Sequence, residues 1–254
     1  MTREATSDRP VGRGEPSSSY TGETSGWNGL AEKLSDLSRD LQEEKDVDRT
    51  LEAIAQAATG TVPGAEHASI SLIDRRREVH TRAATGELPR AVDKAQYDTG
   101  EGPCLDALYE CRTVRLPDLD AEPRWPKFAA QAREMGLASM LAMQLYVHGE
   151  DLGALNLHST HRDAFGDESE QIGLLFAAHA AVALAGAQNE EHLYTALSHR
   201  DVIGQAKGIL MERYKIDAQD AFRLLVVASQ NTNIKLHEVA EYLARTGQLN
   251  TPAR

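Results

Sequence analysis

The residues best suited to contact a polyanion lie between residues 203 and 235. Ile203, Ala206 and Leu210 recur at helical spacing, which predicts a buried apolar stripe. Gly208 lies off this stripe, and a glycine inside a helix costs about 1 kcal/mol relative to alanine, which favours close approach of a partner. Ammonium, guanidinium and amide groups donate hydrogen bonds to phosphates, riboses and splayed bases. The predicted contacts are Gln205, Lys207, Gly208, Arg213, Arg223, Ser229, Gln230, Asn231 and Lys235, with Lys207 leading.

Three short amphipathic helices are expected to position these side chains. Asp217 is predicted to cap the second helix at its N-terminus, Asn233 to cap the third, and Gly247 to end it. Helices of this length can bury one small shared core. Ordinary structural roles stay open for the polar residues, because Ser229 can hydrogen-bond its own helix and Asn231 can form a turn.

The order of residues in this segment also carries a family resemblance. The runs IGQAKGILMERY, DAFRLL, ASQNTN and KLHEVAEYL resemble the ANTAR domain of bacterial response regulators over residues 197–254. Members of that family are transcription antitermination regulators that bind RNA stem-loops in nascent leader transcripts. The resemblance therefore implies RNA as the partner, whereas the periodicity alone indicates only a three-helix module.

The charge balance agrees with a division of labour along the chain. Residues 197–254 contain eight Lys or Arg and six Asp or Glu, a net charge of +2 in a chain whose net charge is −12. The remainder, at −14, would repel a phosphate backbone. A DNA-binding helix-turn-helix is the main alternative, since LHEVAEYLARTGQ resembles its first helix and turn. Only seven residues follow Gly247, which leaves no room for a recognition helix.

Two long apolar helices are predicted, and both favour a homodimer. Leu30, Leu34, Leu37 and Leu41 follow coiled-coil spacing over residues 30–46. Residues 172–187 are apolar or Gly except at His179, so this helix must be covered on two sides, by its own domain and by a second copy. It is too short and too weakly apolar to span a bilayer. The pattern continues into the three-helix module, so one nearly continuous helix is expected. The predicted dimer contacts are Leu34, Leu37, Leu174, Leu175 and Val182.

An α/β module is expected between the two long helices. The strand-like runs are HASISLI, EVHTRAA, CRTVRL, LAMQLYV and LGALNLHS, the last two joined by the turn HGED, with helices near residues 47–58 and 126–134. This order resembles a GAF domain, a small-molecule sensing fold, over residues 47–188. The expected fold class is α+β: a GAF-like antiparallel sheet flanked by helices, then a long linking helix across residues 189–196, then the three-helix ANTAR module.

The segment YDTGEGPCLDALYECRTV is the most distinctive part of this module. Its region borders the ligand cavity in the GAF family, so the resemblance implies a sensor pocket formed by Cys104, Asp106, Trp125 and Phe128, with a small-molecule ligand of unknown identity. A buried free cysteine is more often a small apolar residue than a redox centre, and that question stays open for Cys104. No metal is predicted, because the spacing of the histidines is not that of metal ligands: His67, His80, His148, His158 and His161.

Catalysis is not expected, because the sequence contains no P-loop, dinucleotide fingerprint, HExxH or GxSxG motif. Two cysteines are too few for a disulfide framework, and residues 1–29 are polar, predicted to be disordered, and lack the apolar run of a signal peptide. The sequence thus predicts a cytoplasmic, dimeric, signal-responsive RNA-binding regulator without a membrane segment, controlled by a ligand or an upstream signalling protein. The alternative is a dimeric regulator that binds DNA or a protein partner instead.

Overall fold

The computed structural model describes residues 32, 35, 36, 39, 41, 44, 46–74, 76–110, 113–147 and 150–249. Several sequence predictions lie outside these residues: the tail 1–29, the dimer contacts Leu34 and Leu37, and the side chains of Cys111 and His148. Leu41, the last leucine of the predicted coiled-coil seam, is buried in the core of the sensor module.

A five-stranded antiparallel sheet forms the centre of the sensor module. Its strands are β1 (His67–Ile73), β2 (Val79–Ala84), β3 (Thr113–Leu116), β4 (Ser139–Val147) and β5 (Glu150–Ser159), in the order β2-β1-β5-β4-β3. Every neighbouring pair is antiparallel. Each strand overlaps one of the five strand-like runs, and β5 begins at Glu150, inside the predicted turn HGED. The predicted fold class is confirmed.

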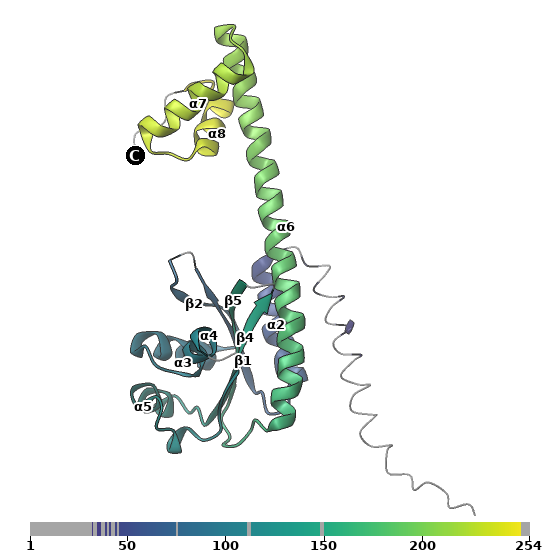
Figure 1. The fold of residues 1–254 in the computed structure, drawn as a ribbon, viewed down its shortest axis with the longest axis vertical. Helices are drawn as coiled ribbons and strands as arrows, with labels where there is room; N and C mark the ends of the chain where they lie inside the picture. Colours follow the sequence, from purple (N-terminus) through teal and green to yellow (C-terminus); the bar gives the residue numbers. More distant parts are fainter. Residues whose placement is uncertain are drawn as a thin grey trace, which may run out of the picture.

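Helices cover both faces of this sheet (Figure 1). The helices of the sensor module are α2 (Val47–Thr61), α3 (Glu87–Thr99), α4 (Pro103–Tyr109), the 3₁₀ turn η1 (Leu119–Ala121) and α5 (Pro126–Glu134). The C-terminal helices are α6 (Asp167–Tyr214), α7 (Ala218–Thr232) and α8 (Leu236–Thr246). Helix α2 and the first half of α6 pack on one face of the sheet, and α3, α4 and α5 pack on the other.

The two faces differ in polarity because side chains alternate along a strand. Ile70 of β1 and Leu155 of β5 point into the apolar core shared with α2 and α6. The residues that alternate with them on the opposite face are polar and fully buried: Ser69, Ser71, Asn156 and His158. The sheet therefore buries a polar surface under α3 and α4.

Helix α6 is one uninterrupted element of 48 residues that links the two modules. Its sensor half packs on the sheet through a buried face that includes Gly173, Phe176, Ala180 and Leu184, and its last turns form the first helix of the C-terminal module. This confirms the prediction of a nearly continuous helix. Figure 1 shows the helix running along the sheet and onward to α7 and α8.

Helix α6 is also the one described helix that is long and apolar enough to cross a membrane by composition. An 18-residue window within it has a mean hydropathy of 1.4, and 39% of that window is buried inside the protein. The helix meets this criterion because it is longer than the apolar segment 172–187, which by itself is too short to span a bilayer. The core helix of a soluble protein meets the same criterion, and α6 packs on the sheet as such a helix does.

The C-terminal module is a three-helix unit built from the end of α6, α7 and α8. Its shared core consists of Ala206, Leu210, Ala221, Leu225, Val239, Ala240 and Leu243. Asp217 caps α7, since its side chain accepts hydrogen bonds from the amides of Gln219 and Asp220. The prediction for Asn233 is wrong: it ends α7 in a left-handed conformation, and Lys235 is the N-cap of α8. Asparagine is favourable both as the N-cap of a helix and in the left-handed conformation that ends one, so its residue type alone does not distinguish the two roles.

A hydrogen-bonded carboxylate fixes the end of β5 just before α6. Glu66 Oε2 accepts hydrogen bonds from Thr160 N (2.6 Å), Thr160 Oγ1 (2.7 Å) and Ser159 Oγ (3.2 Å). The backbone hydrogen bond from Thr160, followed by that from its hydroxyl, lowers the pKa of Glu66 from 4.5 to about 2.

This low pKa gives a pH-dependent contribution to stability. Because the folded state binds the proton less tightly than the unfolded state, the contribution is present above pH 4.5 and lost as the pH falls toward 2. We expect Glu66→Gln to unfold at lower urea concentration than the wild type at pH 7, and the difference to shrink on acidification. A difference that stayed constant with pH would show that the ionised carboxylate has no such role.

Candidate functional site

A buried polar network lies between the sheet and helices α3 and α4. Asn156 of β5 is at its centre, and its Nδ2 donates to Ser71 Oγ (3.0 Å) and Asp93 Oδ1 (3.1 Å) and lies 3.3 Å from Cys104 Sγ. Thr81 Oγ1 donates to Asp93 Oδ2 at 2.9 Å. The network joins β1, β2, β5, α3 and α4, and Ser71, Asp93, Cys104 and Asn156 have no exposed surface.

Tyr97 closes the network on the side of β2. Its hydroxyl lies 2.6 Å from Ser71 Oγ and 3.1 Å from Thr81 Oγ1. Burial, followed by the negative charge of Asp93, raises the pKa of Tyr97 well above its ordinary value. The phenol therefore stays neutral and can both donate and accept hydrogen bonds.

The start of α4 is attached to the network through a glutamine of α3. Gln96 Oε1 accepts a hydrogen bond from the amide of Cys104 at 2.8 Å. This contact requires glycine at position 102, because a Cβ there would lie 2.5 Å from the Gln96 side chain and the backbone has φ +140°. The approach of α3 to α4 thus explains the second glycine of the GEGP sequence, whereas the first, Gly100, ends α3 in a left-handed conformation.

Four buried polar atoms beside this network have no hydrogen-bond partner among the described residues. They are Ser69 Oγ, Asn156 Oδ1 and both ring nitrogens of His158. His158 Nε2 lies 3.8 Å from Asp93 Oδ1, too far for a hydrogen bond. An unsatisfied buried polar atom typically costs about 1–3 kcal/mol, so these atoms are the donors and acceptors that a polar ligand at this position would satisfy.

The surface of the three-helix module offers two hollows, one on each side of α6. One is lined by Gln205, Gly208, Ile209, Glu212, Arg213 and Ala244, and therefore lies between α6 and α8. The other is lined by Ala196, His199, Arg200, Ile203, Gly204, Lys207 and Phe222, and lies between α6 and α7. The imidazoles of His199 and His237 stack at 3.7 Å beside this second hollow and hold α8 against α6.

Cations in the module fall into two groups according to their partners. Arg223 forms an ion pair with Asp220 (2.7 Å) and Lys215 with Glu212 (2.6 Å). Lys207 and Arg213 form no ion pair with any residue of the described part of the chain. Their charges are therefore available to an external anion.

Comparison with protein families decides the identity of both modules. A GAF domain model matches residues 44–185, more than half of the chain, and an ANTAR domain model matches residues 191–243. The chain belongs to the GAF family and carries a C-terminal ANTAR domain. It therefore has the architecture of a GAF-ANTAR regulator, as its sequence predicted. No curated protein matches it.

Solved structures show the same GAF fold at low sequence identity. The GAF domain of an Acinetobacter phosphoenolpyruvate-protein phosphotransferase superimposes with a TM-score of 0.51 at 16% identity, covering 64% of this chain and 96% of that one. The photosensory core module of a Stigmatella aurantiaca phytochrome gives 0.55 at 14% identity, covering 89% of this chain and 47% of that one. At these identities the similarity concerns the fold alone.

Three of the four predicted pocket residues of the GAF domain share one apolar cluster: Cys104, Trp125 and Phe128. Cys104 also contacts the buried polar network, through Ser71 and Asn156. Asp106 Oδ2 accepts a hydrogen bond from Trp125 Nε1 at 3.0 Å, which ties α4 to the segment before α5. Among the four predicted pocket residues, Cys104 is the one with a contact to the polar network. Asp106, Trp125 and Phe128 hold α4 and α5 in place.

Sequence reasoning missed most of the network residues. Ser69, Ser71, Asn156 and His158 are visible in HASISLI and LGALNLHS as polar residues at every second position of otherwise apolar strands. That alternation was the available signal. It became meaningful only through the pairing of β1 with β5, which places Ser69 opposite Asn156.

The predicted RNA contacts of the ANTAR domain lie at several different places on its surface. Gln205, Gly208 and Arg213 share the α6–α8 hollow, whereas Lys207 lies in the α6–α7 hollow. Ser229 Oγ donates to the carbonyl of Ile234 at 2.6 Å, so its hydroxyl stabilises the α7–α8 turn. The remaining predicted contacts are exposed on α7 and at the start of α8: Arg223, Gln230, Asn231 and Lys235.

The environment of Cys104 predicts an unreactive thiol. Complete burial, followed by the charge of Asp93, raises its pKa to about 12, and only the thiolate is nucleophilic. In a Cys111→Ser background, we expect native protein at pH 8 to show no reaction with an aromatic disulfide reagent, and urea-unfolded protein to react with one thiol. Native labelling as fast as that of the unfolded chain would contradict this.

Proposed function

We propose that this protein is a signal-responsive transcription antitermination regulator that binds RNA stem-loops in leader transcripts through its ANTAR domain. The observation that carries the proposal is the ANTAR match over residues 191–243, which covers the end of α6, all of α7 and most of α8. Both matched domains are regulatory, which favours a protein without catalytic activity.

The ANTAR surface supports RNA in its polar chemistry. Lys207 and Arg213 form no ion pair with the described residues, and each lines one of the two hollows beside α6. Gly208 is exposed and a Cβ there would meet nothing within 4 Å of the protein, which leaves the helix backbone open to a phosphate or ribose. Phosphate contacts from such residues position an RNA, and exposed amides such as Gln205 can read unpaired bases.

The buried network of the GAF domain is the proposed signal-sensing centre. Its unpartnered atoms on Ser69, Asn156 and His158 offer donors and acceptors to a small polar ligand. Residues of α3, α4 and β5 meet there, so a ligand would change the packing of the sheet that supports α6. A shift of that kind is a population change between two packings of one fold.

A second copy of the chain is the proposed partner of α6. Four exposed apolar residues form a stripe along one side of this helix: Leu175 (42% exposed), Val182 (63%), Leu193 (63%) and Leu197 (52%). Their spacings of seven, eleven and four residues keep them on one side at 3.6 residues per turn, over a length of about 33 Å. The stripe extends the predicted contact from the GAF domain to the start of the ANTAR domain.

The mechanism that follows is coupling of the two domains through one helix. We place the GAF domain at residues 47–188, the helical linker at 189–196 and the ANTAR domain at 197–254. The protein is proposed to be cytoplasmic. Because α6 is continuous across this division, a change in its packing or register in the dimer reaches both ANTAR domains together. The dimer then presents two RNA-binding surfaces whose spacing depends on the sensor.

Salt-dependent binding to a leader RNA with two adjacent stem-loops tests the function, with a DNA duplex of matched length as the competitor. We expect selective RNA binding that weakens as salt increases and that is lost in the Lys207→Ala/Arg213→Ala variant. Equal affinity for the DNA duplex, or an unchanged affinity of the variant for RNA, would contradict the proposal. The isolated ANTAR domain, assayed in parallel, separates an inhibited sensor state from a surface that does not bind RNA.

A further inference from the structure

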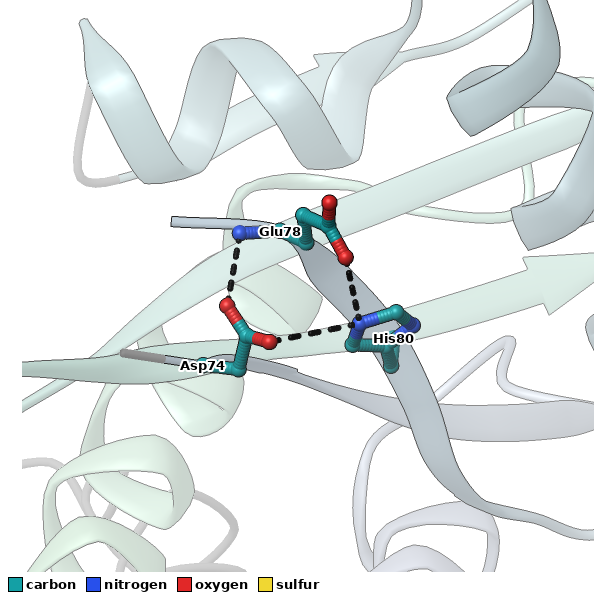
Figure 2. A group of neighbouring side chains, drawn as sticks. All are labelled: Asp74, Glu78 and His80. Atoms are coloured by element: carbon teal, nitrogen blue, oxygen red, sulfur yellow. Dashed lines mark hydrogen bonds and ion pairs between the residues drawn. The ribbon is translucent and has the colours of Figure 1, made fainter. Parts of the chain in front are cut away.

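Three metal-ligating side chains converge at the edge of the sheet, where β1 turns into β2 (Figure 2). His80 Nε2 lies 3.8 Å from Asp74 Oδ2 and 3.7 Å from Glu78 Oε2, and the three ligand atoms all lie within 4.8 Å of one another. Neither distance is short enough for a hydrogen bond. The three ligand atoms therefore face a common point without a side-chain hydrogen bond between them.

The orientation of Asp74 is fixed by the hairpin turn. Its Oδ1 accepts hydrogen bonds from the amides of Arg76 (2.8 Å) and Glu78 (2.9 Å). These two bonds hold the carboxylate of Asp74 in one orientation. The second oxygen, Oδ2, is left directed at His80, as Figure 2 shows.

A hollow of about 380 Å³ adjoins this cluster and connects it to α6. Asp74 and His80 line it on one side, and Glu191 and His192 of α6 line it on the other. Asp46 and Asp48 from the start of α2 also line it, and the one guanidinium of the lining, Arg82, pairs with Asp48. Four carboxylates against one paired cation make the hollow electronegative, which favours a bound cation.

We propose that Asp74, Glu78 and His80 bind a divalent transition-metal ion of the zinc class, with His192 as the fourth ligand. One imidazole with carboxylate oxygens suits Zn²⁺ and its neighbours, whereas Mg²⁺ prefers oxygen ligands alone. Ligand atoms about 2.0–2.2 Å from a tetrahedral ion are separated by about 3.3–3.6 Å. The two separations from His80, 3.8 Å and 3.7 Å, therefore need to close by only a few tenths of an ångström.

The position of this site gives it a regulatory role. Residues 188–192 follow Ala187, the last residue of α6 in the GAF core, so a metal ion would join the β1–β2 edge to the helix where it leaves the sensor. Metal occupancy then provides a second input to α6, separate from the buried polar network. The binding site itself does not depend on the proposed RNA activity.

Zinc binding to the full-length, chelator-treated protein tests the site directly by calorimetry with Zn²⁺ alone. We expect one site per chain that His80→Ala weakens by at least about tenfold, because loss of even an outer-shell partner typically costs 10- to 100-fold. Glu78→Gln should weaken the same site. His161→Ala is the matched control, since this exposed imidazole faces a single carboxylate, that of Glu66, at 3.0 Å, and its loss should leave the affinity unchanged.

Two further variants separate a metal site from a surface ion-pair cluster. Arg76→Gln removes a positive charge that acts on Asp74 and should tighten zinc binding, whereas it would not affect zinc bound elsewhere. His192→Ala should weaken binding if α6 supplies the fourth ligand, and unchanged affinity would overturn that part. If His80→Ala and Glu78→Gln bind zinc as the wild type does, the whole proposal is overturned.

Discussion

Replacing Val182 and Leu193 with glutamate should convert the proposed dimer into monomers and sharply reduce binding to an RNA with two stem-loops. Both side chains are 63% exposed on the apolar stripe of α6, so the substitutions leave the core of the chain intact. In the dimer each would bring two uncompensated carboxylates into an apolar interface, which is strongly unfavourable. Loss of simultaneous engagement of two stem-loops typically reduces affinity by a factor of about 10²–10⁴.

Light scattering and RNA titration on the same samples measure this effect. Thr195→Glu is the matched control, because it adds the same charge to an exposed position about 200° around the helix from Leu193. The control should remain dimeric. A double variant that still dimerises and still binds the paired stem-loops with wild-type affinity would contradict the role of α6 as the dimer seam.

The second large effect is expected from Gly153→Ala in β5. A Cβ at this position would lie 2.0 Å from the backbone carbonyl oxygen of Ser71 in the paired strand β1. Neither backbone can move without separating the strands, so we expect a destabilisation above the roughly 1–3 kcal/mol of ordinary overpacking. The buried network should be lost as well, because Ser71 belongs to it.

Urea unfolding followed by circular dichroism, together with limited proteolysis, resolves where the damage occurs. The GAF domain should become sensitive to protease, while residues of α7 and α8 stay protected because their core is separate. Gly186→Ala is the control, since a Cβ there meets nothing within 4 Å and the substitution should stabilise α6 slightly. Wild-type stability of Gly153→Ala would show that the strands can accommodate a side chain at this point.

Much of the fold was predictable because it depends on local pattern. The five strands follow apolar runs bounded by turn residues, and the continuity of α6 follows from an apolar pattern without a proline between residues 167 and 214. Helix α3 was missed because its sequence, ELPRAVDKAQYDT, is polar and has a proline in its first turn. Its buried face mixes apolar residues with Asp93 and Gln96 of the polar network, which weakens the usual apolar signal.

The proposed sensing centre was less predictable because it depends on long-range pairing. Asn156 and Ser71 are 85 residues apart, and Asp93 comes from a helix that the pattern did not indicate. The same applies to Asp74, Glu78 and His80, whose spacing has no metal-ligand signature until a hairpin brings them together. A site whose residues come from several strands thus appears in the sequence only as isolated polar residues.

The most direct test of RNA binding by the ANTAR domain is the salt dependence of the affinity for Lys207→Ala and Lys215→Ala. Each variant removes one lysine from α6 or its C-terminal cap, but only Lys215 is engaged in an ion pair, with Glu212. If Lys207 contacts a phosphate, its loss should weaken RNA binding. The slope of log affinity against log salt should then become less negative by about 0.7–0.9, while Lys215→Ala changes neither the affinity nor the slope. Identical slopes and affinities for the wild type and both variants would contradict RNA recognition through this face of the domain.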